Sequence, residues 1–485
     1  MLATGHGAAR LGVAASVVDV EVDLASRGVA AFRLVGLSQG AARGMEERIC
    51  AALRNSGYGG PSHPVTVNFA PASLPKEAPP LDLPLAAALL AAMTHVPREA
   101  LAGTLLHGEL ALDGRVRPVA GALAAAEAAR AAGLTRFACA AEVAAEASAL
   151  REIAVHPVRD LREVAAFLCD EAPSAMAAAQ LAPDDLSGLP DLADLRGQFQ
   201  ARRALELAAA GGHGLLLVGP PGSGKSMLAR RLPGILPPLD VNEAIEVTRV
   251  HSAAGLLLRG GSANGLMSRR PFRSPHHSIS AAGLVGGGRP VGPGELSLAH
   301  LGVLFLDELP EFRRDALESL RQPLEDGRLS LVRATGAMLL PCRTTVIAAM
   351  NPCTCGYLGS RLRACTCTDG AIARYRARLS GPLLDRLDLR VDVPSVTFAE
   401  LSSGAPGESS AAVRERVRAV RETQAARQGC VNALIEPPRL RASLRPTRAA
   451  RRLLEHAVDR FGLSARAHDR ALRVALTIKD LCKCH

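Results

Sequence analysis

Residues 219–226 have the types and spacing that suit binding of a polyphosphate. They follow the apolar run 215–218 and precede the helix-compatible run 227–232. In such a strand–loop–helix setting, glycines let backbone N–H groups face phosphate oxygens, while a lysine and a hydroxyl reach the phosphates and Mg²⁺. The sequence therefore predicts a Walker A loop for ATP and Mg²⁺, with Lys225 on the phosphates and Ser226 on the metal. The expected loop residues are Gly219, Pro220, Pro221, Gly222, Ser223, Gly224, Lys225 and Ser226.

Two further apolar runs end in polar side chains that could complete a hydrolytic site. Residues 302–306 lead into Asp307 and Glu308, which is the Walker B arrangement. Asp307 would hold Mg²⁺, mostly through water, and Glu308 would polarise the attacking water as a general base. Residues 344–350 lead into Asn351, whose amide could orient the same water. Together with the phosphate loop, these runs predict hydrolysis of ATP.

Four cysteines begin directly after Asn351. The spacing Cys353-x-Cys355 and Cys365-x-Cys367 could close a tetrahedral Zn²⁺ site, although each pair is tighter than the usual C-x2-C knuckle. The alternative is four reduced thiols on a surface loop. We favour zinc, because two close pairs across a Gly- and Arg-containing loop suggest a shared ligand.

The two adjacent histidines, His276 and His277, invite a metal interpretation. On an extended segment they would point to opposite faces, so that joint ligation is awkward. We expect a structural or DNA-facing role for them instead.

These residues need a scaffold, and the chain is long enough for several domains. Residues 1–168 mix strand-like runs with Ala-rich helices, which predicts an α+β domain, and 169–190 are typical of a linker. Residues 191–395 alternate apolar strands with helices around the phosphate loop, which predicts a parallel α/β core. Residues 396–485 have Arg-rich helical periodicity and predict a helical lid. The expected fold class is a multidomain α/β protein.

The net charge of +10 and the pI of about 9.4 favour an anionic partner, with nucleic acid first. An Arg-rich proteome would give the same balance. Residues 328–340 predict a β-hairpin that turns at Thr335-Gly336, and Arg328 and Arg333 on it could contact DNA phosphates or form an ordinary solvated face. No apolar run is long enough to span a membrane, and no secretion signal is recognisable, so we expect a cytoplasmic protein.

Several long segments resemble the magnesium-chelatase-like AAA+ ATPases, in particular their ComM/YifB branch. They are PFRSPHHSIS (271–280), LVGGGRPVGPGELSLAHLGVLFLDELPEF (284–312), RQPLEDG (321–327), AAMNPCTCG (348–356) and LSGPLLDRLDL (379–389). The resemblance implies a hexameric ring that drives DNA branch migration in natural transformation. It implies that Asn351 is sensor 1, Arg386 is the arginine finger and Arg466 is sensor 2, with Arg470 as the alternative for sensor 2. Without the resemblance, Arg386 would be assigned a surface ion pair with Asp385 or Asp388.

The N-terminal segment is similar to the proteolytic fold of Lon proteases. Where that fold has D-G-P-S-A, this chain has Asp82-Leu83-Pro84-Leu85-Ala86, so that Leu85 stands at the position of the nucleophilic serine. The position of the catalytic lysine falls near Leu123. Leucine offers neither a nucleophile nor a base, and Ser/Lys peptide hydrolysis is therefore excluded here.

Two other functions stay open. A metal-chelatase motor subunit would remodel an enzyme partner, and a docking module would use ATP only to lock its assembly. The intact Glu308 argues against the docking module. Chains of the family usually continue with a further helix after a segment such as 471–481, whereas this one stops at Cys482-Lys483-Cys484-His485. We expect a shortened or altered lid rather than a metal site there.

Overall fold

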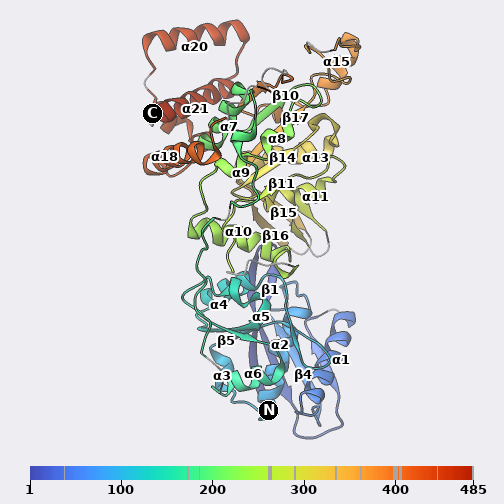
Figure 1. The fold of residues 1–485 in the computed structure, drawn as a ribbon. Helices are drawn as coiled ribbons and strands as arrows, with labels where there is room; N and C mark the ends of the chain where they lie inside the picture. Colours follow the sequence, from blue (N-terminus) through green and yellow to red (C-terminus); the bar gives the residue numbers. More distant parts are fainter. Residues whose placement is uncertain are drawn as a thin grey trace.

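The computed structural model describes most of the chain. Not described are residues 38, 172–173, 185, 260–264, 289–290, 334–335, 361–362, 397–401, 403–406, 445 and 483–485, and the side chains of 39, 41, 332, 333, 336 and 337. The molecule is elongated, with one sheet near the N-terminus, a second sheet in the middle and a group of helices at the far end (Figure 1). A multidomain α/β fold with a helical C-terminal part is thus confirmed.

The N-terminal sheet has seven strands in the order β3-β4-β2-β1-β5-β8-β9. Its centre is antiparallel, through the pairs β1–β2 and β2–β4, and the pairs β3–β4, β1–β5, β5–β8 and β8–β9 are parallel. A short ribbon of β6 and β7 lies beside it. The strands are β1 (Leu2–Leu11), β2 (Ala14–Leu24), β3 (Phe32–Val35), β4 (Val65–Ala70), β5 (Thr104–His107), β6 (Glu109–Leu110), β7 (Val116–Arg117), β8 (Arg136–Ala140) and β9 (Ala154–Val158).

Helices cover this sheet and fill its core with small apolar side chains. The central one has the sequence DLPLAAALLAA, and all of its residues are buried against β1 and β2. Such a uniformly apolar helix is expected only inside a core. The helices are α1 (Gln39–Asn55), η1 (Pro79–Leu81), α2 (Asp82–Ala92), α3 (Glu99–Ala102), α4 (Ala122–Ala131), α5 (Ala141–Ala147) and α6 (Leu161–Leu168).

The second sheet is parallel and has the strand order β11-β14-β17-β10-β18. The three central strands are completely buried, which explains their continuous apolar sequences. Because parallel strands end at one edge, the residues that follow β10, β14 and β17 lie together there. The strands are β10 (Leu215–Val218), β11 (Phe272–Arg273), β14 (Val303–Leu306), β17 (Thr345–Met350) and β18 (Leu389–Asp392).

Short helices surround the second sheet, and two small ribbons extend from it. The ribbon of β12 (Gly286–Gly287) and β13 (Gly292–Pro293) is minimal, whereas β15 (Arg328–Arg333) and β16 (Gly336–Pro341) form a regular antiparallel hairpin. The helices are η2 (Leu192–Asp194), α7 (Phe199–Gly211), α8 (Lys225–Ala229), α9 (Leu232–Ile235), α10 (Val241–Ala253), η3 (Leu257–Arg259), α11 (Ala281–Val285), α12 (Glu295–Leu298), η4 (Leu309–Glu311), α13 (Arg314–Ser319), α14 (Arg321–Asp326), α15 (Asp369–Arg376) and α16 (Gly381–Leu384).

The C-terminal part is helical throughout its described residues. It contains α18 (Ser410–Gln428), η5 (Asn432–Leu434), α19 (Pro437–Ser443), α20 (Arg448–Phe461) and α21 (Ala465–Cys482). Helices α18 and α21 pack on α7 of the parallel core. Helix α20 stands apart from them, and none of its residues is buried (Figure 1).

The N-terminal sheet and the parallel core meet through α10, which packs on α4. The Ser252 hydroxyl of α10 donates a 2.7 Å hydrogen bond to Glu146 of α5, and Arg249 lies 3.2 Å from Glu127. Burial raises the pKa of Glu146 to about 7. At the same junction, Val13 of the β1–β2 turn packs in one apolar cluster with Leu329 and Leu340 of the hairpin. The root of the hairpin is thus joined to the N-terminal sheet.

Candidate functional site

The phosphate loop has the geometry that its sequence predicts. It leaves β10, turns through Gly222 (φ 75°) and Gly224 (φ 90°), and enters α8 at Lys225. A side chain on Gly219 would place its Cβ 2.1 Å from the carbonyl oxygen of Val393. Glycine is therefore required at these turns and at this close approach. The loop exposes the N-terminus of α8 toward the strand edge where the other expected residues lie.

Lys225 and Ser226 connect the loop to the two neighbouring strands. The Lys225 ammonium donates to the carbonyl oxygens of Gly219 (2.7 Å) and Pro220 (2.9 Å), and to the Asn351 side chain (3.2 Å). Burial lowers the pKa of Lys225. The Ser226 hydroxyl donates to Asp307 at 2.7 Å, so that the two expected Mg²⁺ ligands already face each other. The structure thus brings together the residues expected from three separate strands.

A cavity of about 380 Å³ opens at this point. It is lined by residues from the ends of β10, β14 and β17, and its size and mixture of charged and apolar groups suit a small ligand. The lining residues are Pro221, Gly222, Ser223, Gly224, Lys225, Ser226, Met227, Asp307, Glu308, Met350 and Asn351.

Glu308 has a partner that the sequence did not reveal. Its backbone is left-handed (φ 53°, ψ 47°), and its carboxylate lies 3.3 Å from Nδ1 of His277. A left-handed conformation is rare outside glycine and often marks a functional position. The His277 ring lies edge-on to Phe312, with 6.4 Å between the ring centroids. The segment after β11 thus carries a residue of the site, because β11 lies directly beside β14.

One expectation about the two histidines was wrong. Their rings do not point to opposite faces but lie against each other, with centroids 4.1 Å apart and planes tilted by 34°. The reason is that His277 lies in a turn rather than on an extended segment, so that the alternation of a strand does not apply. His276 bonds to the Ser278 hydroxyl at 2.8 Å.

The cavity of this chain is not lined by Arg386, which was expected to serve a neighbour's ATP, or by either candidate for sensor 2, Arg466 and its alternative Arg470. Arg386, directly after α16, and Arg466, at the start of α21, both contact the carboxylate of Glu325 on α14, the second at 3.4 Å. Arg470 binds Asp385 at 3.1 Å. The ion pair of Arg386 is therefore made with Glu325, and not with Asp385 or Asp388.

The four cysteines converge on one point. The Sγ atoms of Cys353, Cys355 and Cys365 lie 3.4, 3.5 and 3.7 Å apart, and those of all four cysteines, Cys367 included, lie within 4.8 Å of one another. In a tetrahedral zinc thiolate with Zn–S bonds of about 2.3 Å, sulfur atoms are separated by about 3.8 Å. Backbone N–H groups of Tyr357 and Thr366 lower the pKa of Cys355 to about 5, whereas burial and the neighbouring thiols raise the pKa of Cys365, so that Cys355 rather than Cys365 is a thiolate at neutral pH. The residues fit Zn²⁺.

The cysteine loop also packs on the phosphate loop. A side chain on Gly356 (φ 86°) would place its Cβ 2.6 Å from the ring of Pro221. The other expected cluster is only partly described. Cys482 is exposed at the end of α21, while Cys484 and His485 lie outside the described residues.

The hairpin carries its expected arginines at opposite ends. Arg328 is exposed near the root, where β15 pairs with Pro341. At the other end the backbone of Arg333 pairs with Gly336, which begins β16 rather than belonging to the turn; the side chain of Arg333 and residue Thr335 lie outside the description.

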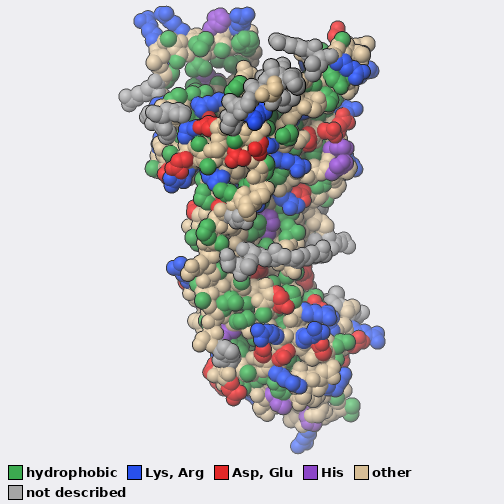
Figure 2. Space-filling view, in the orientation of Figure 1, with side chains coloured by type: hydrophobic (Ala, Val, Ile, Leu, Met, Phe, Trp, Pro, Cys, Tyr) green, Lys and Arg blue, Asp and Glu red, His purple; other side chains and the backbone are tan. Residues whose placement is uncertain are grey.

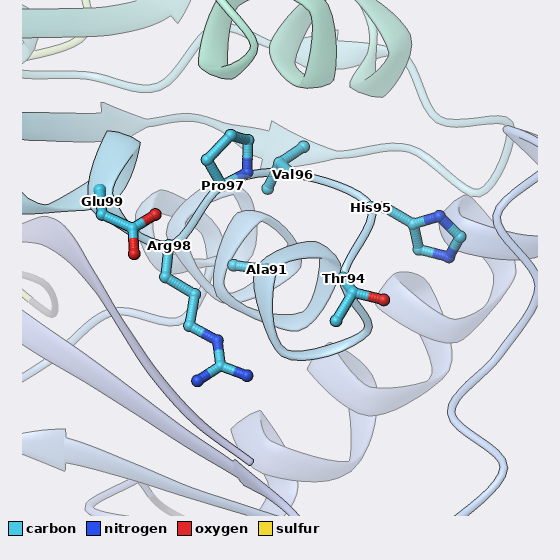
Figure 3. Close-up of a pocket in the computed structure, with 7 residues that line it drawn as sticks. All are labelled: Ala91, Thr94, His95, Val96, Pro97, Arg98 and Glu99. Atoms are coloured by element: carbon cyan, nitrogen blue, oxygen red, sulfur yellow. The ribbon is translucent and has the colours of Figure 1, made fainter.

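A second hollow, of about 460 Å³, lies on the N-terminal sheet domain beyond α2. It is lined by Thr94, His95, Arg98 and Glu99 among others, and Figure 3 shows that these side chains point in different directions. Polar groups that do not converge cannot fix the orientation of a ligand, so this hollow is not the stronger candidate. The positions compared with the Lon dyad, Leu85 and Leu123, are completely buried.

A parallel sheet with a phosphate loop, an acidic pair and a polar sensor position on adjacent strand ends defines the class as an AAA+-type motor core. Family comparisons agree with this class. The family described as "Magnesium chelatase, subunit ChlI" matches residues 191–401, "Subunit ChlI of Mg-chelatase" matches 20–143, and "Magnesium chelatase, subunit ChlI C-terminal" matches 407–485. This family implies ATP and Mg²⁺ as cofactors.

Similar proteins cover almost the whole chain. The competence protein ComM of Haemophilus influenzae is 42% identical over 99% of this chain and 94% of its own length. The uncharacterized protein YifB is 44% identical in Salmonella typhimurium and 42% identical in Escherichia coli, over 99% and 98% of this chain and 93% and 92% of those proteins. The chain therefore belongs to the magnesium-chelatase-like family that includes YifB and ComM. No helix among the described residues has the length and apolarity needed to cross a membrane.

Proposed function

We propose that this protein is an ATP-hydrolysing motor that acts on DNA and drives branch migration or strand separation. The observation that carries the proposal is the set of contacts at the strand edge, where Lys225, Ser226, Asp307 and Asn351 are joined within one cavity. In it, Lys225 binds the β- and γ-phosphates, Ser226 and Asp307 hold Mg²⁺, and the Glu308 carboxylate takes a proton from the attacking water.

DNA as the substrate is supported by charge and by relationship. The chain has a net charge of +10, and a 42% identical relative is named a competence protein. Helix α20 adds an exposed basic surface with Arg448, Arg451, Arg452 and Arg460, and Figure 2 shows blue side chains gathered over it. Binding would be governed by phosphate contacts, since the chain has no tryptophan and few aromatic residues on which bases could stack.

The direct test is the rate of ATP hydrolysis without DNA, with duplex DNA and with forked or branched DNA at fixed salt. We expect stimulation by DNA that is largest for branched substrates, together with displacement of a labelled strand. Equal rates in all samples would remove DNA as the substrate. They would favour the alternative that the family's name suggests, a magnesium-chelatase-type motor that remodels a protein partner.

We further propose that the active form is a homo-oligomeric ring, with six subunits as in the resembling family. Arg386 and Arg466 lie outside the cavity of their own chain, side by side on Glu325, where both could serve the nucleotide of a neighbour. An arginine supplied in trans is worth about 10³–10⁵ in rate. Arg386→Ala should therefore bind ATP but hydrolyse it poorly, and mixing with Lys225→Ala subunits should restore part of the activity. Full activity of a monomer would contradict the ring.

The remaining proposals concern the scaffold. Residues 1–168 would be a non-proteolytic domain of Lon-like fold, 169–190 a linker, 191–395 the motor core and 396–485 a lid. The cysteine cluster would hold one Zn²⁺ and brace the loop that lies against Pro221. The location would be cytoplasmic, where DNA is accessible.

A further inference from the structure

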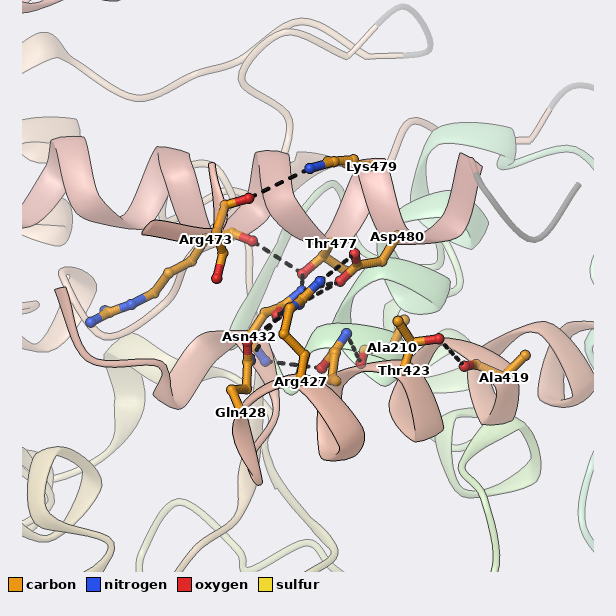
Figure 4. A network of polar contacts seen from close by, with 12 residues as sticks. Ala210, Ala419, Thr423, Arg427, Gln428, Asn432, Arg473, Thr477, Lys479 and Asp480 are labelled. Carbon is orange, nitrogen blue, oxygen red and sulfur yellow. Dashed lines mark hydrogen bonds and ion pairs between the residues drawn. The ribbon is translucent and has the colours of Figure 1, made fainter. Parts of the chain in front are cut away.

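A buried network of polar side chains holds the last turns of α21 against α18 and η5 (Figure 4). Arg427 donates to both carboxylate oxygens of Asp480, each at 2.8 Å. The Asn432 amide donates to Thr477 and to Asp480, each at 3.0 Å. Thr477, Asn432 and Asp480 are buried, so that their bonds are costly to leave unmade. This end of α21 therefore has one fixed position within the lid.

His213 extends the network from the lid into the motor core. Its ring is completely buried between α7 and β10, with Nδ1 2.7 Å from Asp388 and Nε2 2.8 Å from the Thr477 hydroxyl. Because a carboxylate only accepts hydrogen bonds, Nδ1 carries a proton. A side chain on Gly211 would place its Cβ 2.3 Å from the His213 ring and 2.5 Å from Thr477, so that glycine there leaves room for the contact. The His213 ring thus connects α21 to Asp388 through two hydrogen bonds.

The same helix, α21, also contacts the residues directly before Arg386. Arg470 donates to the Asp385 carboxylate at 3.1 Å and to the carbonyl oxygen of Leu384 at 3.5 Å. Arg470 and Thr477 are two turns apart on α21, a separation of about 10 Å along its axis. Asp385 and Asp388 flank Arg386 on either side. Helix α21 therefore holds the chain just before Arg386 directly, through Arg470, and two residues after it through the His213 ring.

We propose that α21 positions the arginine finger, with Thr477, His213 and Arg470 as positioning residues for hydrolysis at the neighbouring subunit. The inference rests on the proposed role of Arg386 in trans. Through these two contacts, a rotation of the lid in one subunit moves Arg386 relative to the ATP of the next. Since catalysis by a charged group depends on its placement to within about 1 Å, the orientation of the lid sets the neighbour's rate. Arg470 thereby acts on Asp385 and not as a sensor of its own nucleotide.

The test uses Thr477→Val, which keeps the shape and removes the hydroxyl, and Arg470→Met, which removes the second grip at a partly exposed site. Each should lower kcat about 10- to 100-fold. The KM for ATP and the affinity for a non-hydrolysable ATP analogue should stay at wild-type values, because the phosphate loop is untouched. Lys479→Ala is the matched control, since Lys479 lies on the same helix, is exposed and, among the described residues, donates only to the Ser443 carbonyl oxygen. It should behave as wild type.

Mixing experiments separate a misplaced finger from a damaged fold. A Thr477→Val subunit has an intact phosphate loop and a misplaced finger, so Lys225→Ala subunits, which have a sound finger, should restore its activity. Arg386→Ala subunits should not. Amide hydrogen exchange should rise in residues 384–389 of Thr477→Val and stay unchanged in 219–226.

Three results would overturn the inference. Wild-type kcat in both variants, while Arg386→Ala is inactive and rescued by Lys225→Ala, would leave the finger in place but remove α21 as its support. Failure of Lys225→Ala to rescue Thr477→Val would show a general defect of the lid. Full activity of Arg386→Ala would show that Arg386 is not an arginine finger. It would contradict both its proposed role in trans and its positioning by α21.

Discussion

Helices cover both sheets of this protein, but the side chains at the positions compared here differ: they are polar in the parallel core and apolar in the N-terminal sheet domain. In the parallel core, the ends of β10, β14 and β17 carry Lys225, Asp307 and Asn351 around a cavity. In the N-terminal sheet domain, the helix α2 is buried throughout, and so are Leu85 and Leu123, the two positions compared with the nucleophile and base of Lon proteases. The difference indicates that a helix-covered sheet forms a candidate ligand site only where polar side chains replace part of its apolar packing.

The acids of the two regions show the same contrast. Asp82 of α2 is buried and is satisfied by two 2.8 Å bonds from the Arg48 guanidinium and a third from the backbone of Leu110. Glu308 is 58% exposed and has a left-handed backbone, and among the described residues its carboxylate forms an ion pair only with the His277 ring. A fully paired acid holds the fold together, whereas an acid with free lone pairs can accept a proton.

Of the changes that contrast the two regions, Glu308→Gln should give the largest effect, because it removes chemistry without disturbing packing. The exposed amide is isosteric, so ATP binding and the melting temperature should stay close to wild type. Turnover should fall about 10²–10⁴-fold, as expected for the loss of a general base. Steady-state ATPase rates and nucleotide affinity measure both, with the exposed Glu311→Gln of η4 as the control. Near wild-type turnover would take this role from Glu308.

Leu85→Ala should produce the reverse result. Truncating a completely buried leucine costs about 2–5 kcal/mol of stability, whereas Leu85 does not line the cavity at the phosphate loop. Thermal unfolding should begin at a lower temperature, while ATPase activity per folded molecule should remain within about twofold. Leu112→Ala in the same domain is the control, since Leu112 is 57% exposed. A selective loss of kcat without a loss of stability would show that the N-terminal sheet domain takes part in catalysis.

Glu146→Gln tests the junction of the two regions through pH. Burial raises the pKa of Glu146 to about 7, above its usual value near 4.5. The folded state therefore binds the proton more tightly, and stability falls as the pH rises from about 4.5 through 7, by up to about 3 kcal/mol. Glutamine keeps an acceptor for Ser252 and has no proton to lose. The variant should melt higher than wild type at pH 8 and equally at pH 4.5. The control Glu142→Gln, an exposed site on the same helix, should match wild type. Identical pH profiles of wild type and Glu146→Gln would argue against a buried acid at position 146.

The cysteine cluster should show a local effect of smaller size. The purified protein should contain about one zinc per chain, and Cys353→Ser/Cys365→Ser should lose it. Because Gly356 packs on Pro221, the variant should also bind ATP several-fold more weakly. Metal analysis and nucleotide titration measure these two effects, and Cys430→Ser/Cys482→Ser controls for the loss of two distant thiols. Protein purified without chelator and free of zinc would favour reduced thiols.

The sequence predicted the parts of the site that are encoded locally. The phosphate loop, the acidic pair, the sensor strand and the hairpin are each continuous segments, so that their patterns are visible without a fold. The contact of His277 with Glu308 depends on β11 lying beside β14. The contacts that hold the residues on both sides of Arg386 come from three distant segments, 213, 385–388 and 470–477. Such contacts are set by topology, which a pattern along the chain does not contain.

The hairpin should give the smallest effect, and it joins the two regions. Its root packs on Val13 of the N-terminal sheet, while Arg328 near that root is exposed. If Arg328 and Arg333 contact phosphates, replacing both by alanine should weaken DNA binding equally for all sequences. It should also reduce the slope of log K against log salt by about two units. Basal ATPase activity should survive, because neither residue is assigned a role at the nucleotide, and stimulation by DNA should fall with strand displacement. Arg54→Ala/Arg98→Ala removes the same charge from exposed sites of the N-terminal domain and should leave most of the slope intact.

Equal loss of DNA affinity in both double variants would mean that DNA binding responds to net charge alone. Wild-type binding by the hairpin variant would make the hairpin a solvated face that only braces the N-terminal sheet.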